Sequence, residues 1–307
     1  MAEMKPGSPF SITSDHPRRF ETLLPAEGSS SRIALYRESI RTMPLPSTLW
    51  NRFQRACNEG ASGQQLADIV MGDPVLSAGV LRSANSAMFG LRTPITNLNR
   101  AISHLGYSMV RNIVARHSFS DAATGTGKVY DFHMLWRHGM AVSALAEVVA
   151  RHIDGCNADE AGTLGLFHDI GRLSFNLLTE YMQPAEPDPD KGHLVYEFER
   201  FGCTHIDLGV LLAEHWELPE KIVQGIRYHH HPAHSTVDTV PAEVQKEVLA
   251  VFLADLIAVQ LGFAGGNPGV SPPHPGYAAL MAHTTLQQII DMPEIGKELA
   301  AIDAMEF

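Results

Sequence analysis

The feature that most restricts the fold of this chain is the spacing of its apolar residues, which recur every three or four positions. Leu135, Val142, Leu145 and Val149 show this spacing within residues 134–153. Such recurrence is typical of helices with one apolar face, whereas half-buried strands alternate apolar and polar residues. No stretch of the chain alternates strongly, so the sequence predicts an all-α fold.

Capping signals set the expected starts of several helices. Asp73-Pro74 supplies an N-cap followed by a proline at the first helical position. Asn157 is predicted to cap a helix that runs toward Leu178, and Pro219 is expected at the first position of another helix. Helices are predicted at 33–43, 74–84, 95–103, 107–118, 134–153, 157–178, 194–202, 205–216, 219–230 and 243–262.

Composition along the chain divides it into four parts. Residues 1–30 are rich in Ser, Pro and Gly and are predicted to form a flexible tail. An N-terminal helical lobe is expected over 31–125 and a second helical bundle over 126–262, separated near a run of small polar residues. A Pro/Gly-rich linker and closing helices are expected over 263–307.

Charge and cysteine content narrow the expected environment. The chain of 307 residues has 34 acidic and 23 basic side chains, a formal charge of −11 that repels phosphate backbones, so we expect no nucleic-acid partner. The three cysteines are far apart and indicate reduced thiols. No signal peptide is evident and no apolar stretch approaches the roughly 18–20 residues that span a bilayer. The protein is therefore expected to be cytoplasmic, without membrane insertion.

Sixteen histidines is a high number for this length, and several lie on predicted helices of the second half together with aspartates. Successive groups are separated by 24 to 36 residues, about one helix and one loop, which lets each helix of a bundle direct a ligand at one centre. The candidate metal ligands are His138, His168, Asp169, His205, His229, His230 and Asp255.

Imidazoles and carboxylates suit divalent iron, manganese or zinc. Adjacent helical residues diverge by about 100°, so the pairs His168-Asp169 and His229-His230 are each predicted to serve two metal ions better than one. Two ions about 3.5–4 Å apart could polarise a phosphoryl oxygen and activate a water. A pair of divalent ions is thus the predicted cofactor.

Each of these residues also has a structural interpretation. A single helical histidine is commonly a core or surface residue, Asp169 could bond a backbone turn, and residues 227–231 could form a solvated helix end in which histidines complement the dipole. Nine further histidines are expected to share no common centre: His104, His117, His133, His152, His193, His215, His234, His274 and His283.

Several motifs resemble the HDOD family, the HD-related output domains, in the order that family shows. The likeness covers roughly residues 35–262. In the second half it rests on the segments 135–138, Gly-Leu-Phe-His-Asp-Ile-Gly-Arg at 165–172, Trp-Glu-Leu-Pro at 216–219 and Tyr-His-His-His-Pro at 228–232. In the first half it rests on 45–46, 73–76, Leu-Arg-Ser-Ala-Asn-Ser-Ala-Met-Phe-Gly at 81–90, and 101–106.

The resemblance implies an N-terminal helical lobe packed on an HD-type helical bundle. It also implies a bacterial signal-transduction role, in which the chain binds a ligand or partner with little or no catalysis. Expected partners are response regulators or proteins of cyclic-dinucleotide pathways. A third hypothesis, a pure assembly scaffold, would leave signalling insensitive to changes at His168 and Asp169.

The related HD-GYP phosphodiesterases supply the alternative function, metal-dependent hydrolysis of a cyclic dinucleotide. Their metal ligands map onto the seven candidates named above. Two departures argue against activity: the chain reads His231-Pro232-Ala233-His234 in place of the Gly-Tyr-Pro signature, and Arg172 replaces the usual lysine. If the chain is active, Arg172 is the candidate catalytic residue.

The Asn85-Ser86 motif has two interpretations. Asn-Ser after a helix most simply turns the chain by bonding local backbone groups. Alternatively, this loop lines a groove between the lobes, where Arg82, Arg92 and Arg100 would meet an anionic ligand.

Overall fold

Every regular element that the structure describes is a helix, which confirms the predicted all-α class. The computed structural model describes residues 30–43, 48–93, 95–119, 129–181, 193–263, 277 and 286–303. Almost all of the predicted tail lies outside these residues. The first half contains α1 (Ser30–Arg41), α2 (Thr48–Asn58), α3 (Gly63–Met71), α4 (Pro74–Ala84), the 3-10 helix η2 (Ala87–Phe89), α5 (Leu98–Leu105) and α6 (Tyr107–Phe119).

The second half contains α7 (Phe132–Ala150), α8 (Ala158–Phe167), the 3-10 helix η4 (Ile170–Tyr181), α9 (His193–Phe201), α10 (His205–His215), α11 (Glu220–Tyr228), α12 (His231–His234), the 3-10 helix η5 (Val237–Thr239), α13 (Gln245–Gln260), α14 (Leu286–Ile290) and α15 (Pro293–Asp303). None of the described helices is both long enough and apolar enough to cross a membrane.

The predicted caps are largely confirmed, with two corrections. The side chain of Asp73 accepts a hydrogen bond from the Leu76 amide, and Asn157 caps α8. Pro219 is itself the N-cap of α11, one position before the predicted place. The helix predicted to run from Asn157 toward Leu178 was wrong, because α8 ends at Phe167 and the chain continues as the 3-10 helix η4.

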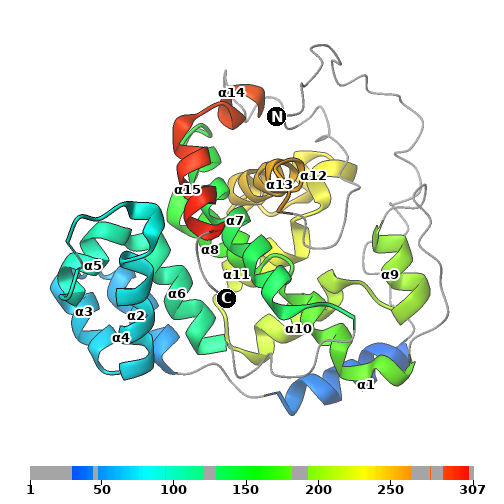
Figure 1. Ribbon diagram of the computed structural model, residues 1–307. Coiled ribbons are helices and arrows are strands. Elements are labelled where there is room, and N and C mark those ends of the chain that lie inside the picture. Colours follow the sequence, from blue (N-terminus) through cyan, green and yellow to red (C-terminus); the bar gives the residue numbers. More distant parts are fainter. Residues whose placement is uncertain are drawn as a thin grey trace.

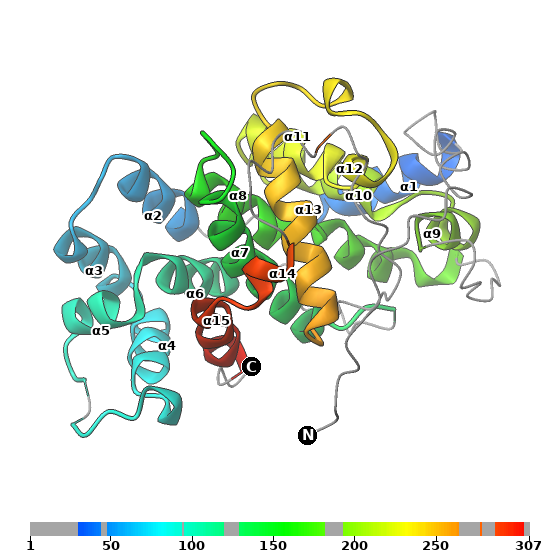
Figure 2. The same ribbon diagram turned by 90° about the horizontal axis from the view of Figure 1, so that it is seen from above.

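Helices α2–α6 gather on one side of the molecule and the later helices on the other (Figures 1 and 2). Helix α1 packs mainly against α10 and η4. The predicted lobe boundary of 31–125 therefore includes one helix that packs with the bundle. Helix α15 lies along α7.

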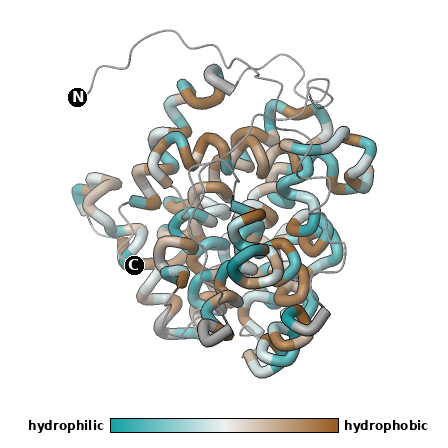
Figure 3. Tube along the Cα trace, turned by 90° about the vertical axis from the view of Figure 1, so that its right-hand side faces the viewer, coloured by the Kyte–Doolittle hydropathy of each residue, from teal (hydrophilic) through white to brown (hydrophobic). Residues whose placement is uncertain are grey.

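Helices α7, α8 and α13 pack against one another at the centre of the bundle. Residues 138–150 of α7 are buried without interruption, as are residues 248–254 of α13. Figure 3 shows the mixed pattern of the surrounding helices, which alternate between apolar and polar along the tube. At Gly139 of α7 a Cβ would lie 2.7 Å from the Leu166 carbonyl oxygen, so glycine is what lets α7 and α8 approach this closely.

A buried ion pair joins the two halves of the fold. Arg111 of α6 is fully buried, and its Nη2 lies 2.7 Å from the Glu147 Oε1 of α7 and 2.8 Å from the Ser143 Oγ. Arg111 Nη1 also donates to the carbonyl oxygen of Asp159 in α8, at 3.3 Å. One arginine from the first half thus contacts two helices of the bundle.

Replacement of Arg111 by Met is expected to lower the free energy of unfolding by about 3–5 kcal/mol, because Glu147 would be left charged and buried without its partner. Lys221→Met is the matched control. The Lys221–Glu160 pair has the same 2.7 Å separation, but its side chains are 52% and 37% exposed. Its loss should cost less than about 1 kcal/mol. Urea unfolding of both variants measures the difference, and equal losses would contradict the structural role given to Arg111.

Candidate metal centre

All seven predicted ligands converge inside the bundle. Their ligand atoms form two groups, each with its atoms within 4.8 Å of one another: Asp169, His205, His229 and His230 in one, and His138, His168 and Asp255 in the other. We call the seven residues the His/Asp cluster. Metal binding itself stays a prediction, but convergence is what a shared site requires.

Most of the cluster stands at helix ends. His138 and Asp255 lie within α7 and α13, but His168 follows the last residue of α8, His205 opens α10 and His229 follows α11. Because α8 ends at Phe167 and η4 begins at Ile170, Asp169 lies in the turn between them.

A close backbone contact brings His205 to Asp169. Gly171 follows Asp169 by two residues, and a Cβ at Gly171 would lie 1.9 Å from the carbonyl oxygen of His205. Only glycine permits that approach. The close packing of the backbone against His205 therefore requires glycine at position 171 of the segment 165–172.

Asp169 connects the two groups of the cluster. Its Oδ1 lies 3.2 Å from His205 Nε2 and 3.8 Å from His229 Nε2. Its Oδ2 lies 3.7 Å from the Nε2 atoms of both His138 and His168. One carboxylate thus faces both groups, one oxygen to each, which is the arrangement that a bridging ligand needs.

The histidines are held in one tautomer by their Nδ1 contacts. His138 Nδ1 lies 2.6 Å from the Phe263 carbonyl oxygen, and the Nδ1 atoms of His168 and His229 lie 2.8 and 2.6 Å from the carbonyl oxygens three residues earlier. His205 Nδ1 lies 2.7 Å from Glu197 Oε2. Because these oxygens accept, each Nδ1 donates a hydrogen bond, and in the neutral form of such a ring the lone pair lies at Nε2.

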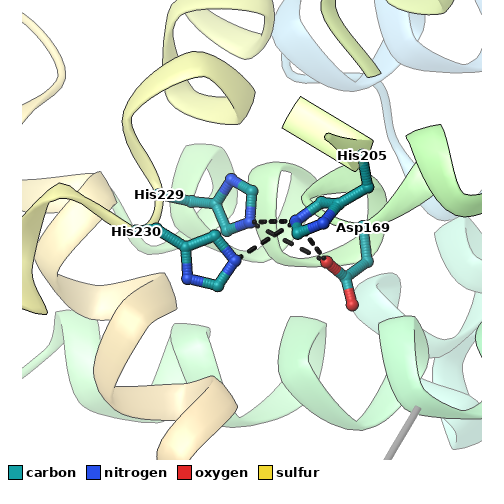
Figure 4. Close-up of side chains that lie close together, drawn as sticks. All are labelled: Asp169, His205, His229 and His230. Carbon is teal, nitrogen blue, oxygen red and sulfur yellow. Dashed lines mark hydrogen bonds and ion pairs between the residues drawn. The ribbon is translucent and has the colours of Figure 1, made fainter. Parts of the chain in front are cut away.

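Three Nε2 atoms of the cluster lie close together. His205 Nε2 lies 3.2 Å from His229 Nε2 and 3.2 Å from His230 Nε2, as Figure 4 shows. Two acceptor nitrogens at hydrogen-bond distance repel unless a cation or a proton lies between them. The donor set therefore fits a metal ion, and imidazole with carboxylate is the chemistry of iron, manganese or zinc sites.

The electrostatics also favour a metal. Burial alone would raise the pKa of the Asp169 carboxyl, but Arg172 and the surrounding imidazoles hold it well below its usual value. Burial lowers the pKa of His168, His229 and His230. Ionised carboxylate and neutral imidazole are the forms that bind metal.

His138 and Asp255 form the most strongly paired part of the cluster, with 3.2 Å between His138 Nε2 and Asp255 Oδ1. Burial acts to lower the pKa of His138, but Asp255 more than offsets it and the pKa is raised. A metal ion bound here would take the place of that proton.

The structure adds to one expectation about histidines and contradicts another. His193, assigned to no common centre, stacks on His205 with ring centroids 5.5 Å apart and contacts the His230 ring at 5.0 Å. The pair His229-His230 does not divide between two groups, since both rings enter the same one. The 100° argument assumed a continuous helix, but α11 ends at Tyr228.

Other histidines lie elsewhere, as expected. His117 Nε2 lies 2.8 Å from Asp73, His215 bonds the Met43 carbonyl, and His104 packs on Phe89. His274, His283 and the side chain of His133 are outside the described residues.

Sequence reasoning missed Glu197 altogether. Its side chain is 1% exposed, and Oε2 accepts from both the backbone amide and Nδ1 of His205, at 2.8 and 2.7 Å. The available signal was its register, because Leu194, Glu197 and Phe201 follow the apolar spacing of α9 and all are buried. A carboxylate in the apolar register of a helix indicates a buried partner.

Arg172 is paired with carboxylates of the site. Its Nη1 lies 3.1 Å from Asp169 Oδ2 and its Nε 3.7 Å from Glu197 Oε1, with the side chain 5% exposed. The guanidinium also lies over the Tyr130 ring. Arg172, the candidate catalytic residue, thus pairs with the candidate ligand Asp169 and with Glu197, which contacts His205.

The Asn85 motif has its simpler, local role. Asn85 Nδ2 donates to the Leu81 and Ile95 carbonyls, and Oδ1 accepts from the Ile95 amide at 2.7 Å. The side chain pins the loop between α4 and α5, which confirms the turn interpretation.

The helical bundle and its His168-Asp169 pair define an HD-type helical protein. A model of the HDOD domain matches residues 43–232, more than half of the chain, and the chain therefore belongs to the HDOD family. Asp255 lies beyond the matched residues.

One relative is an uncharacterised protein of Treponema pallidum (strain Nichols), 26% identical over 214 residues, which are 64% of this chain and 39% of that protein. The chain thus spans well under half the length of that relative.

Solved structures share the fold. An HDOD domain protein of unknown function from Geobacter sulfurreducens has a TM-score of 0.64 and 22% identity, covering 91% of this chain and 99% of that one. A Marinobacter aquaeolei VT8 protein, provisionally described as a signal transduction protein, has a TM-score of 0.64 and 18% identity, covering 90% and 64%. A Shewanella amazonensis SB2B protein, provisionally described as a metal-dependent phosphohydrolase, has a TM-score of 0.54 and 14% identity, covering 90% and 100%.

Glu197→Gln is expected to weaken zinc or manganese binding by roughly 10- to 100-fold, because the carboxylate that orients His205 is lost while the ligand itself remains. Glu199→Gln on the exposed side of α9 is the matched control and should leave affinity unchanged. Metal titration by calorimetry measures both. Equal affinities for the two variants would contradict the orienting role.

The metal-free protein should lose stability as pH falls below about 6.5. Burial lowers the pKa of His231 and of His234 to about 4, whereas imidazoles in the unfolded chain titrate near 6.5. The unfolded state therefore binds more protons between these values, and the free energy of unfolding should fall by about 1 kcal/mol per histidine between pH 7.5 and 5.5. Urea unfolding in chelator measures this, and His234→Gln should reduce the slope. A flat profile would show that these rings are not buried neutral.

Proposed function

We propose that this protein is an HDOD-type signalling module that binds divalent metal ions at the His/Asp cluster and responds to a ligand or partner with little or no catalysis. The observation that carries the proposal is the meeting of three imidazole Nε2 atoms, with His205 Nε2 lying 3.2 Å from those of both His229 and His230. Such a donor set is stabilised by a bound cation.

The two groups of the cluster would hold one ion each. His138, His168 and Asp255 would bind one, and His205, His229 and His230 the other, with Asp169 between them. Iron, manganese or zinc suits these donors. When bound, such ions act as Lewis acids toward phosphoryl oxygens.

Two features favour a regulatory role over an enzymatic one. Arg172 pairs with Asp169 and Glu197, so its charge stabilises these two carboxylates of the site. His231-Pro232-Ala233-His234 replaces the Gly-Tyr-Pro signature of the phosphodiesterases. The provisional signal-transduction description of the Marinobacter protein supports the same choice. Cytoplasmic response regulators or cyclic-dinucleotide pathway proteins are the proposed partners.

The complete ligand set favours one alternative, a metal-dependent phosphodiesterase of HD-GYP type acting on a cyclic dinucleotide. The description of the Shewanella protein as a metal-dependent phosphohydrolase agrees with it. Metal-loaded protein incubated with cyclic di-GMP distinguishes the two. Turnover on the order of 1 per second would establish the enzyme, whereas binding without turnover supports the regulatory module.

Elemental analysis of the purified protein should find about two first-row divalent ions per chain, and Asp169→Ala should remove most of them, because Asp169 faces both groups. Asp154→Ala, at an exposed carboxylate beyond α7, is the matched control and should retain the metal. A wild-type protein that is metal-free and takes up no iron, manganese or zinc would overturn the proposed function.

A further inference from the structure

His193 occupies a place beside the His/Asp cluster that neither the metal ligands nor the HDOD motifs account for. It is the first residue of α9, four positions before Glu197, and residues at this spacing share one face of a helix. Glu197 bonds His205 directly. His193 therefore faces the same group of ligands.

The ring of His193 lies against two of those ligands. It is nearly parallel to His205, with centroids 5.5 Å apart and planes inclined by 15°, and nearly edge-on to His230 at 5.0 Å. His193 is absent from both groups whose ligand atoms lie within 4.8 Å of one another. It is thus a neighbour of the metal ligands and not a member of the set.

One nitrogen of His193 lacks a partner. Its Nε2 is buried and makes no hydrogen bond to any described residue. Buried polar atoms are nearly always hydrogen-bonded, so an unpaired one beside a ligand site points to a missing ligand.

The charge of the loaded site selects the kind of ligand. Two divalent ions together with Arg172 would outweigh the carboxylates of Asp169, Asp255 and Glu197, leaving a positive centre. Such a centre attracts an oxyanion, and an imidazole N–H is a suitable donor to its oxygens.

We propose that His193 contacts a phosphate oxygen of a ligand bound at the metal ion that Asp169, His205, His229 and His230 hold. This inference rests on the proposed function and adds a ligand-contacting residue to it. Free phosphate and a phosphodiester share the required chemistry.

The test separates metal binding from anion binding. Zinc content is first measured for the full chain and for His193→Ala, followed by calorimetric titration of the zinc-loaded proteins with inorganic phosphate and, separately, with cyclic di-GMP. We expect unchanged zinc content and an affinity at least about tenfold lower for whichever of the two anions the wild-type protein binds. Binding of phosphate alone identifies free phosphate as the ligand, and binding of cyclic di-GMP alone identifies the phosphodiester.

Two further variants complete the design. His193→Gln keeps an N–H donor near the Nε2 position and should recover most of the affinity, while His152→Ala, at the end of α7, should behave as wild type. Unchanged anion affinity in His193→Ala would overturn the inference and leave the proposed function intact. So would loss of zinc in that variant, which would make His193 a metal ligand. A wild-type protein that takes up no iron, manganese or zinc would overturn the proposed function itself.

Discussion

The hydrogen bonds at Nδ1 determine what the centre of this protein can bind. Carbonyl oxygens and one carboxylate accept hydrogen bonds from Nδ1 of His138, His168, His205 and His229, which directs the Nε2 atom of each ring inward. Repulsion between converging Nε2 lone pairs therefore lowers the stability of the folded protein, unless a bound cation relieves it. Metal binding and folding are coupled through these contacts, as in other sites whose ligands are preorganised.

The fold supplies those contacts from distant parts of the chain. The carbonyl oxygen of Phe263, which follows α13, accepts a hydrogen bond from His138 Nδ1. Arg137 lies over the Phe263 ring, 4.1 Å from its centroid. Arg137 also pairs with Asp303 of α15. The C-terminal segments beyond the matched HDOD residues thus help to orient His138.

Much of this could be predicted from the sequence, because helical periodicity and caps are local properties. The seven ligands followed from spacing and from the HDOD resemblance. The break after Phe167 could not be predicted, since the apolar pattern continues through Ile170 and Leu173 in η4. The contact between Glu197 and Arg172 could not be predicted, because the register that marks Glu197 as buried does not identify its partner.

The same limitation applies to the ion pair between Arg111 and Glu147, which joins the two halves of the fold. Glu147 lies on α7, the helix that carries His138, and Gly162 lies on α8, which ends one residue before His168. A Cβ at Gly162 would lie 2.4 Å from Glu147 Oε1 and 2.7 Å from Arg111 Nη2. The buried charge pair is therefore fitted closely between both ligand-bearing helices and α6. A change in the relative position of α7 and α8 on metal or ligand binding would have to move Arg111 as well, since a buried charge cannot lose its partner without a large cost. Arg111 thus links α6 directly to the two helices that carry His138 and lead to His168.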